Sequence, residues 1–150
     1  MTKTYDVAIL GGGIVGRTLA LLLARERLRV ALVERPAAAG GSAPDIRAYA
    51  LNAASRALLE SVRAWPGEGD AVTPVRHMWV ADADPLPEAE GIDALAAVHF
   101  GADTAPSDPL AWIVDVPALE AALGQAVAFQ AGIDRLIDDA GARPKAGLTV

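Results

Sequence analysis

Cysteine is absent from the 150-residue sequence, which excludes disulfides, thiol catalysis and cysteine-ligated metal sites. Histidine is scarce. His77 and His99 are too far apart for a helical metal motif, so we interpret both as strand or surface residues. No lysine- or arginine-rich block is present, and the net charge is −6. We therefore expect neither a metal site nor a surface for nucleic acid or anionic membranes.

A long apolar run is also missing. The apolar helical segment at residues 14–24 is interrupted by Arg17 and Thr18 and is too short to span a bilayer. The first predicted strand begins within five residues of Met1, so we expect no signal peptide. The hydrophobic fraction of 53% and the charged fraction of 21% fit one globular domain with a real core. These features favour a soluble, cytoplasmic protein.

The sequence does contain one complete motif at residues 5–34, YDVAILGGGIVGRTLALLLARERLRVALVE. An apolar strand at residues 7–10 leads into three glycines and an apolar helix. A second apolar strand, residues 30–33, then ends on the acid Glu34. The order strand, glycine turn, helix, strand and acid predicts the βαβ unit that binds a dinucleotide in α/β proteins.

Each part of the motif has a physical role. Gly11 permits the tight turn out of the strand, Gly13 lets the backbone approach a pyrophosphate, and Gly16 lets the helix pack closely. The first helical residues, Ile14 and Val15, present free N–H groups and the positive end of the helix dipole to phosphates.

Glu34 lies where a carboxylate can accept hydrogen bonds from both hydroxyls of an adenosine ribose. The same carboxylate would repel a 2′-phosphate. NADP is therefore disfavoured at this position, and FAD or NAD remains.

The remaining chain predicts alternating short elements. We expect a loop at 37–44, an extended piece at 45–51, and a helix at 53–65, capped by Asn52, with Leu58, Leu59 and Val62 on its apolar face. A strand at 75–81 with both faces covered, a loop at 82–93 and a return strand at 96–100 follow. The last predicted elements are a strand at 112–114, a proline-started helix at 117–126, and strands at 127–130, 135–137 and 148–150.

Four patches of the sequence, taken together, resemble one protein family. They are DVAILGGGIVG with Glu34, DIRAYALNAASRALLESVRAW, PVRHMWVAD and LAWIVDVPALEAAL. In this order they are similar to the FAD-dependent aromatic hydroxylases (class A flavoprotein monooxygenases), specifically the ubiquinone-biosynthesis hydroxylase branch. The D-x-R-x-x-A-L segment is the most telling, because dinucleotide-binding folds in general do not share it.

The resemblance implies an α/β fold of the p-hydroxybenzoate-hydroxylase type, with a Rossmann-like βαβ start and part of a substrate-covering β-sheet. It also implies an FAD enzyme that uses NAD(P)H as co-substrate and O₂ to hydroxylate an aromatic ring, such as that of a ubiquinone precursor. The flavin carries the difficult chemistry, so no catalytic side chain is identified. We interpret the carboxylate pairs Asp82/Asp84 and Asp138/Asp139 as solvated loop residues.

The resemblance also implies the cofactor contacts. Gly11, Gly13 and Gly16 would hold the FAD pyrophosphate with Ile14 and Val15, and Glu34 the adenosine ribose, with Arg35 beside it. Arg47 of the D-x-R segment would lie along the phosphate–ribityl portion, and an ion pair with Asp45 is its alternative role. Pro117 stands where relatives have an arginine that contacts the cofactor, so that contact is missing or supplied elsewhere.

The resemblance further implies a discontinuous domain organisation. Residues 1–73 and 110–150 would belong to the FAD-binding domain and 74–109 to the substrate-domain sheet, and the family's later motifs would fall beyond residue 150. A polyprenyl substrate would allow peripheral membrane association. Two other interpretations stay open: another FAD-dependent oxidoreductase with the same start, such as an amine oxidase, halogenase or geranylgeranyl reductase, or a non-catalytic nucleotide-binding module.

Overall fold

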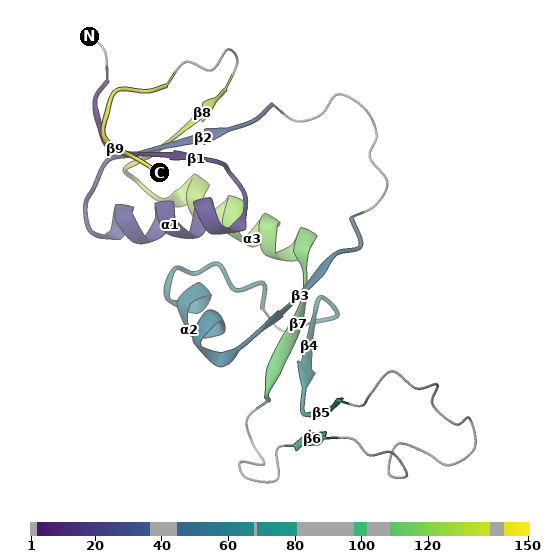
Figure 1. Ribbon diagram of the computed structural model, residues 1–150. Helices are drawn as coiled ribbons and strands as arrows, with labels where there is room; N and C mark the ends of the chain where they lie inside the picture. The colour runs from purple at the N-terminus through teal and green to yellow at the C-terminus, as the bar shows by residue number, and fades with distance from the viewer. Residues whose placement is uncertain (1–2, 37–44, 68, 81–97, 102–108, 139–142) are drawn as a thin grey trace.

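A computed structural model describes residues 3–36, 45–67, 69–80, 98–101, 109–138 and 143–150. A parallel sheet carries the glycine motif. Its strand order is β8-β2-β1-β9, formed by β1 (Tyr5–Leu10), β2 (Val30–Glu34), β8 (Ile133–Ile137) and β9 (Ala146–Thr149). All three pairings are parallel. The helices α1 (Ile14–Arg25) and α3 (Val116–Phe129) lie side by side against one face of this sheet (Figure 1).

The apolar pattern of the first 34 residues explains this layer. Every residue of β2 is buried, and Val30 and Leu32 have no exposed surface. The helices α1 and α3 contribute further buried side chains to the same core, namely Ala20, Leu21, Leu119, Leu123 and Val127. Burying one such Val or Leu side chain stabilises the fold by about 1.5–3 kcal/mol. The core therefore fixes the end of β2 beside the start of α1.

A second layer continues below the helices in Figure 1. It is an antiparallel sheet of order β3-β7-β4, formed by β3 (Ala48–Leu51), β7 (Ala111–Asp115) and β4 (Val72–Val75). Helix α2 (Ala53–Ser61) follows β3, and the Asn52 side chain accepts a hydrogen bond of 2.9 Å from the Ser55 N–H. The predicted cap is therefore confirmed.

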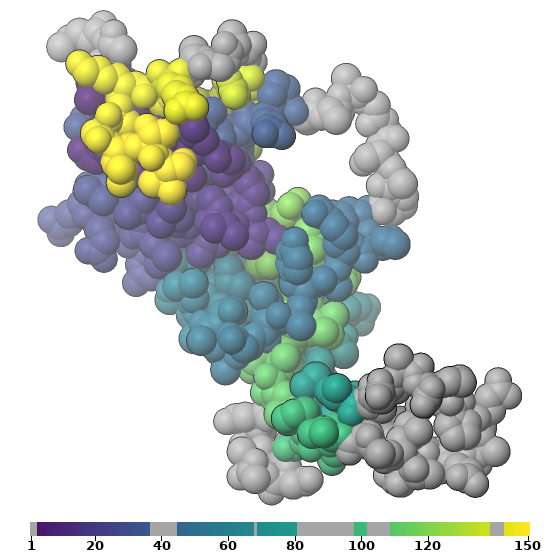
Figure 2. All heavy atoms as spheres, in the orientation of Figure 1, coloured from purple at the N-terminus to yellow at the C-terminus, as the bar shows by residue number. Residues whose placement is uncertain are grey.

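Among the described residues, a third sheet pairs β5 (His77–Val80) with β6 (Val98–Gly101). It lies at the opposite end of the molecule from the C-terminal segment, as Figure 2 shows. His77 and His99 are exposed strand residues, as predicted. The expectation that strand 75–81 has both faces covered is wrong, because Met78, Trp79 and Val80 of β5 are all more than 40% exposed.

Three other local predictions are corrected. Residues 127–129 end α3 instead of forming a strand, because Val127 is one turn beyond Leu123 and is buried on the same face. Helix α2 ends at Ser61, well before residue 65, and Arg63 adopts a left-handed φ of 58°. Leu59 and Val62 are buried as expected, but Leu58 is 42% exposed.

The predicted loops at 37–44 and 82–93 lie outside the described residues. In the described part of the chain, no helix is long and apolar enough to cross a membrane.

Candidate dinucleotide-binding site

Two glycines shape the turn between β1 and α1. Gly11 has a φ of +129°, a value that side chains disfavour, and its N–H donates to the Val33 carbonyl at 2.9 Å. A Cβ placed on Gly16 would lie only 1.9 Å from the Gly11 carbonyl oxygen. The predicted structural reasons for both glycines are therefore confirmed: one permits the turn and the other permits the close helix–strand approach.

The two glycines between them differ in their surroundings. A Cβ on Gly13 would meet nothing within 4 Å, so the space in front of the first turn of α1 is open. A Cβ on Gly12 would lie 2.3 Å from Cγ of Glu34. Gly12 therefore makes room for the acid at the end of β2. The sequence pattern did not predict this role, because it concerns a tertiary contact.

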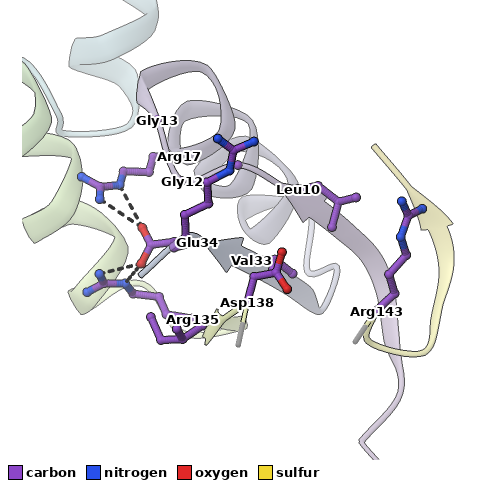
Figure 3. A pocket seen from close by; sticks show the side chains of 12 residues that line it. Leu10, Gly12, Gly13, Arg17, Val33, Glu34, Arg135, Asp138 and Arg143 are labelled. Carbon is purple, nitrogen blue, oxygen red and sulfur yellow. Dashed lines mark hydrogen bonds and ion pairs between the residues drawn. The ribbon is translucent and has the colours of Figure 1, made fainter. Parts of the chain in front are cut away.

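The Glu34 carboxylate is bound by two arginines from different elements (Figure 3). Its Oε1 accepts hydrogen bonds from Nε and Nη2 of Arg17 at 3.3 and 3.0 Å. Its Oε2 lies 2.8 and 2.6 Å from Nε and Nη2 of Arg135. The Glu34 side chain is only 8% exposed, so this contact is largely shielded from water.

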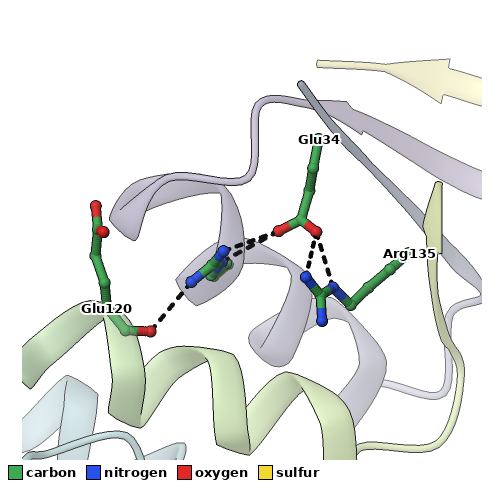
Figure 4. Close-up of polar contacts among 4 residues, drawn as sticks. Glu34, Glu120 and Arg135 are labelled. Atoms are coloured by element: carbon green, nitrogen blue, oxygen red, sulfur yellow. Dashed lines mark hydrogen bonds and ion pairs between the residues drawn. The ribbon is translucent and has the colours of Figure 1, made fainter. Parts of the chain in front are cut away.

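Arg17 has a second partner. Its Nη1 donates to the backbone carbonyl of Glu120 in α3 at 3.1 Å, as Figure 4 shows for the arginine drawn between Glu34 and Glu120. One guanidinium thus connects α1, where it originates, with the end of β2 and with α3. The planar group can serve both partners because its donors point in fixed, divergent directions.

Glu34, Arg17 and Arg135 border a cavity of about 830 Å³ at the carboxyl end of the parallel strands. This is the edge at which open α/β sheets bind their ligands. Four arginines line it against two carboxylates, so the lining has an excess of positive charge. The charged residues are Arg17, Arg35, Arg135, Arg143, Glu34 and Asp138. Asp138 therefore lines the cavity, whereas Asp82, Asp84 and Asp139 lie outside the described residues.

A second cavity of about 480 Å³ shares Gly11 and Gly13 with the first and extends along the first turn of α1 to Arg47 and Tyr49. Arg47 donates from Nε and Nη2 to Asp45 at 2.9 and 2.6 Å. Hydrogen bonds from the Arg47 side chain, and then from its backbone N–H, lower the pKa of Asp45 to about 2. The ion pair with Asp45, which was the alternative role predicted for Arg47, is therefore present. Arg47 also lines the cavity at the start of α1.

All eight predicted contact residues line one or both cavities: Gly11, Gly13, Ile14, Val15, Gly16, Glu34, Arg35 and Arg47. The sequence motifs do not predict Gly12, Arg17, Arg135 or Arg143 as lining residues. Arg17 directly follows Gly16, so its place in the glycine motif could have suggested a role at this site. Arg135 could not, because it reaches Glu34 only through the pairing of β8 with β2.

Pro117 lies in the first turn of α3, where it leaves the helix intact. No group of three or more histidine or acidic residues placed to hold a metal ion occurs among the described residues.

Comparison with known proteins places this geometry in context. Residues 9–62 match the family model of the NAD(P)-binding Rossmann-like domain. The chain is 40% identical over 74 residues to the 3-demethoxyubiquinol 3-hydroxylase of Escherichia coli, covering 47% of this chain and 18% of that protein. It is 35% identical over 82 residues to the ubiquinone hydroxylase UbiL of Rhodospirillum rubrum, covering 53% of this chain and 19% of that protein.

Solved structures agree at the level of the fold. The probable FAD-dependent monooxygenase pqsL of Pseudomonas aeruginosa matches with a TM-score of 0.60 at 21% identity, covering 90% of this chain and 33% of that one. The p-nitrophenol 4-monooxygenase PnpA of Pseudomonas putida matches with a TM-score of 0.59 at 15% identity, covering 92% of this chain and 32% of that one. The predicted fold and the resemblance to ubiquinone-biosynthesis hydroxylases are confirmed. The chain spans less than a fifth of the length of either of these two hydroxylases.

Proposed function

We propose that this chain is the dinucleotide-binding part of an FAD-dependent monooxygenase that uses NAD(P)H and O₂ to hydroxylate an aromatic ring. One observation carries the proposal: the glycine turn, the open start of α1 and the acid at the end of β2 all border one cavity at the carboxyl edge of the parallel strands. The similarity to two ubiquinone-pathway hydroxylases supports a ubiquinone precursor or similar phenol as the substrate class.

The residues at the two cavities fit the ADP half of FAD. The open space at Gly13 leaves room for a pyrophosphate against the N–H groups of Ile14 and Val15. Arg47, which lines the second cavity, would bind a phosphate once it exchanges Asp45 for that partner. Glu34 and Arg35 would flank the adenosine. The bound flavin would supply the oxygen-transfer chemistry, and this part of the chain would hold and orient it.

The domain organisation is part of the proposal. Residues 1–73 and 110–150 would form part of the FAD-binding domain, and 74–109 part of a substrate-covering sheet. The separate β5–β6 sheet supports this division. Strand β4 does not follow it, because β4 spans the boundary at 73/74 and pairs with β7, which lies beyond the boundary at 109/110. A polyprenyl substrate would bring the protein to a membrane surface.

Flavin binding tests the proposal directly. We expect the purified protein, incubated with FAD and then desalted, to retain a flavin absorption spectrum. Gly13→Val should abolish this retention without unfolding the sheet, because Gly13 has an ordinary φ of −79° and its added side chain would project into the open space. Unchanged flavin retention in Gly13→Val would contradict phosphate binding at the turn.

The reaction class needs a separate measurement. The 150-residue part alone should be inactive, so the assay uses the complete protein that contains it. Loaded with FAD, that protein should oxidise NAD(P)H faster when a phenolic ubiquinone precursor is present, and it should form the hydroxylated product. FAD retention without either activity would favour the non-catalytic nucleotide-binding module.

A further inference from the structure

The hydrogen-bonding capacity of the Glu34 carboxylate is already used. A carboxylate offers about four lone-pair positions on its two oxygens. Arg17 donates two hydrogen bonds to Oε1. Arg135 donates one from Nε to Oε2, and its Nη2 lies 2.6 Å from the same oxygen, so each carboxylate oxygen faces two arginine nitrogens. A ribose diol needs acceptors of the same kind, so it can bind Glu34 only if one arginine leaves.

The two arginines are not held equally. The Arg17 side chain is 20% exposed and has a second anchor at the Glu120 carbonyl. The Arg135 side chain is 49% exposed, and Glu34 is the partner that its guanidinium contacts in the described part of the chain. Releasing Arg135 into water therefore costs less than releasing Arg17, because it breaks fewer contacts and exposes less buried charge.

We propose that Arg135 is a built-in competitor for the adenosine ribose. The inference rests on the proposed function, since it assumes that a dinucleotide binds at Glu34. The ribose hydroxyls take the Oε2 positions that Arg135 vacates, while Arg17 keeps Oε1 and holds the carboxylate in place. Arg135 thus sets the affinity of the site for adenosine nucleotides without contacting the reacting part of the cofactor.

Calorimetric titration with ADP tests this role. Arg135→Met retains most of the aliphatic stem and removes the guanidinium. We expect it to bind ADP roughly threefold to tenfold more tightly, the range for removing one partly exposed competing ion pair. The gain should shrink for 2′-deoxy-ADP, which lacks one of the two hydroxyls.

Arg143→Met is the matched control, because it removes the same charge from the lining of the same cavity but no contact to Glu34. It should weaken ADP binding, since the site loses positive charge near an anionic ligand. Arg17→Met should also weaken binding, because the carboxylate loses its anchor. Thermal unfolding of each variant confirms that it is folded.

The possible outcomes distinguish failure of this inference from failure of the proposed function. ADP binding by the parent protein with equal or weaker binding by Arg135→Met would overturn the inference and leave the proposed function standing. Arg135 would then act as a phosphate-binding or general electrostatic residue. Absence of ADP binding in both proteins would overturn the proposed function and the inference with it.

Discussion

Two arginine–carboxylate contacts at neighbouring cavities differ in almost every physical respect. Glu34 is bound by Arg17 and Arg135, which are 17 and 101 residues away in sequence, and its side chain is 8% exposed. Asp45 is bound by Arg47, two residues away, and the Arg47 side chain is 61% exposed. The first contact requires the folded sheet, whereas the second needs only a local turn of the chain.

This difference predicts different energetic consequences. Water and salt screen the Asp45–Arg47 pair, so it contributes little to the stability of the fold. At Glu34 the carboxylate has lost its hydration, so removing its charge leaves two partly buried guanidinium groups without compensation. Similar arginine–carboxylate distances therefore correspond to different contributions to stability at the two sites. We expect Arg47 to exchange its partner more readily than Arg17.

The largest expected effect comes from Gly16→Val, which removes the backbone geometry behind the Glu34 contact. The new side chain would overlap the Gly11 carbonyl, where even a Cβ would lie at 1.9 Å. We expect a loss on the order of 3–5 kcal/mol in the free energy of unfolding, measured by urea denaturation.

Gly124→Ala in α3 is the control. Its Cβ would meet Arg17 Nη1 at an ordinary 3.5 Å, so replacing a helical glycine should stabilise the protein by about 0.5–1 kcal/mol. An equal loss of unfolding free energy in Gly16→Val and Gly124→Ala would show that any added side chain is harmful in this region.

Glu34→Gln tests the buried contact itself. The amide has nearly the same shape but cannot balance the charge of Arg17 and Arg135. We expect a loss of about 2–3 kcal/mol, below the range for fully buried pairs because the arginines are partly exposed. The matched variant Asp45→Asn should leave the urea midpoint unchanged. Similar shifts in the two variants would mean that burial does not distinguish the contacts.

The smallest expected effect is the acid titration of Asp45, whose pKa lies near 2 because of the hydrogen bonds from Arg47. A depressed pKa means that the contribution of this group to stability is present above its ordinary pKa of 3.8 and is lost as the pH falls through about 2. NMR titration of the Asp45 carboxyl carbon measures the midpoint, which Arg47→Met should raise. A midpoint near 3.8 in the parent protein would mean that the pair does not form in solution.

The sequence predicted the part of the fold that depends on local signals. The glycines, the apolar runs and Glu34 located β1, α1 and β2 to within about two residues, because turn geometry and burial are both encoded within 30 positions. The eight proposed cofactor contacts came from the same signals and from the D-x-R segment.

What the sequence could not predict depends on contacts between distant elements. The position of β8 beside β2, and with it Arg135 beside Glu34, is a matter of sheet order. The strand predicted at 127–130 failed because a short apolar run fits a helix end as well as a strand, and packing of Val127 against the core decided between them. The role of Gly12 could not be predicted, because it depends on the Glu34 side chain, which lies 22 positions away in the sequence.

The sequence separation of the Glu34 contacts has a consequence for the order of events during synthesis. Arg17 is already available when Glu34 leaves the ribosome, but Arg135 follows 101 residues later. Long-range contacts close slowly, because loop entropy is lost before they form. Because β8 and α3 both follow residue 115, the second arginine reaches Glu34 only after nearly the whole described chain has been made and β8 can pair with β2.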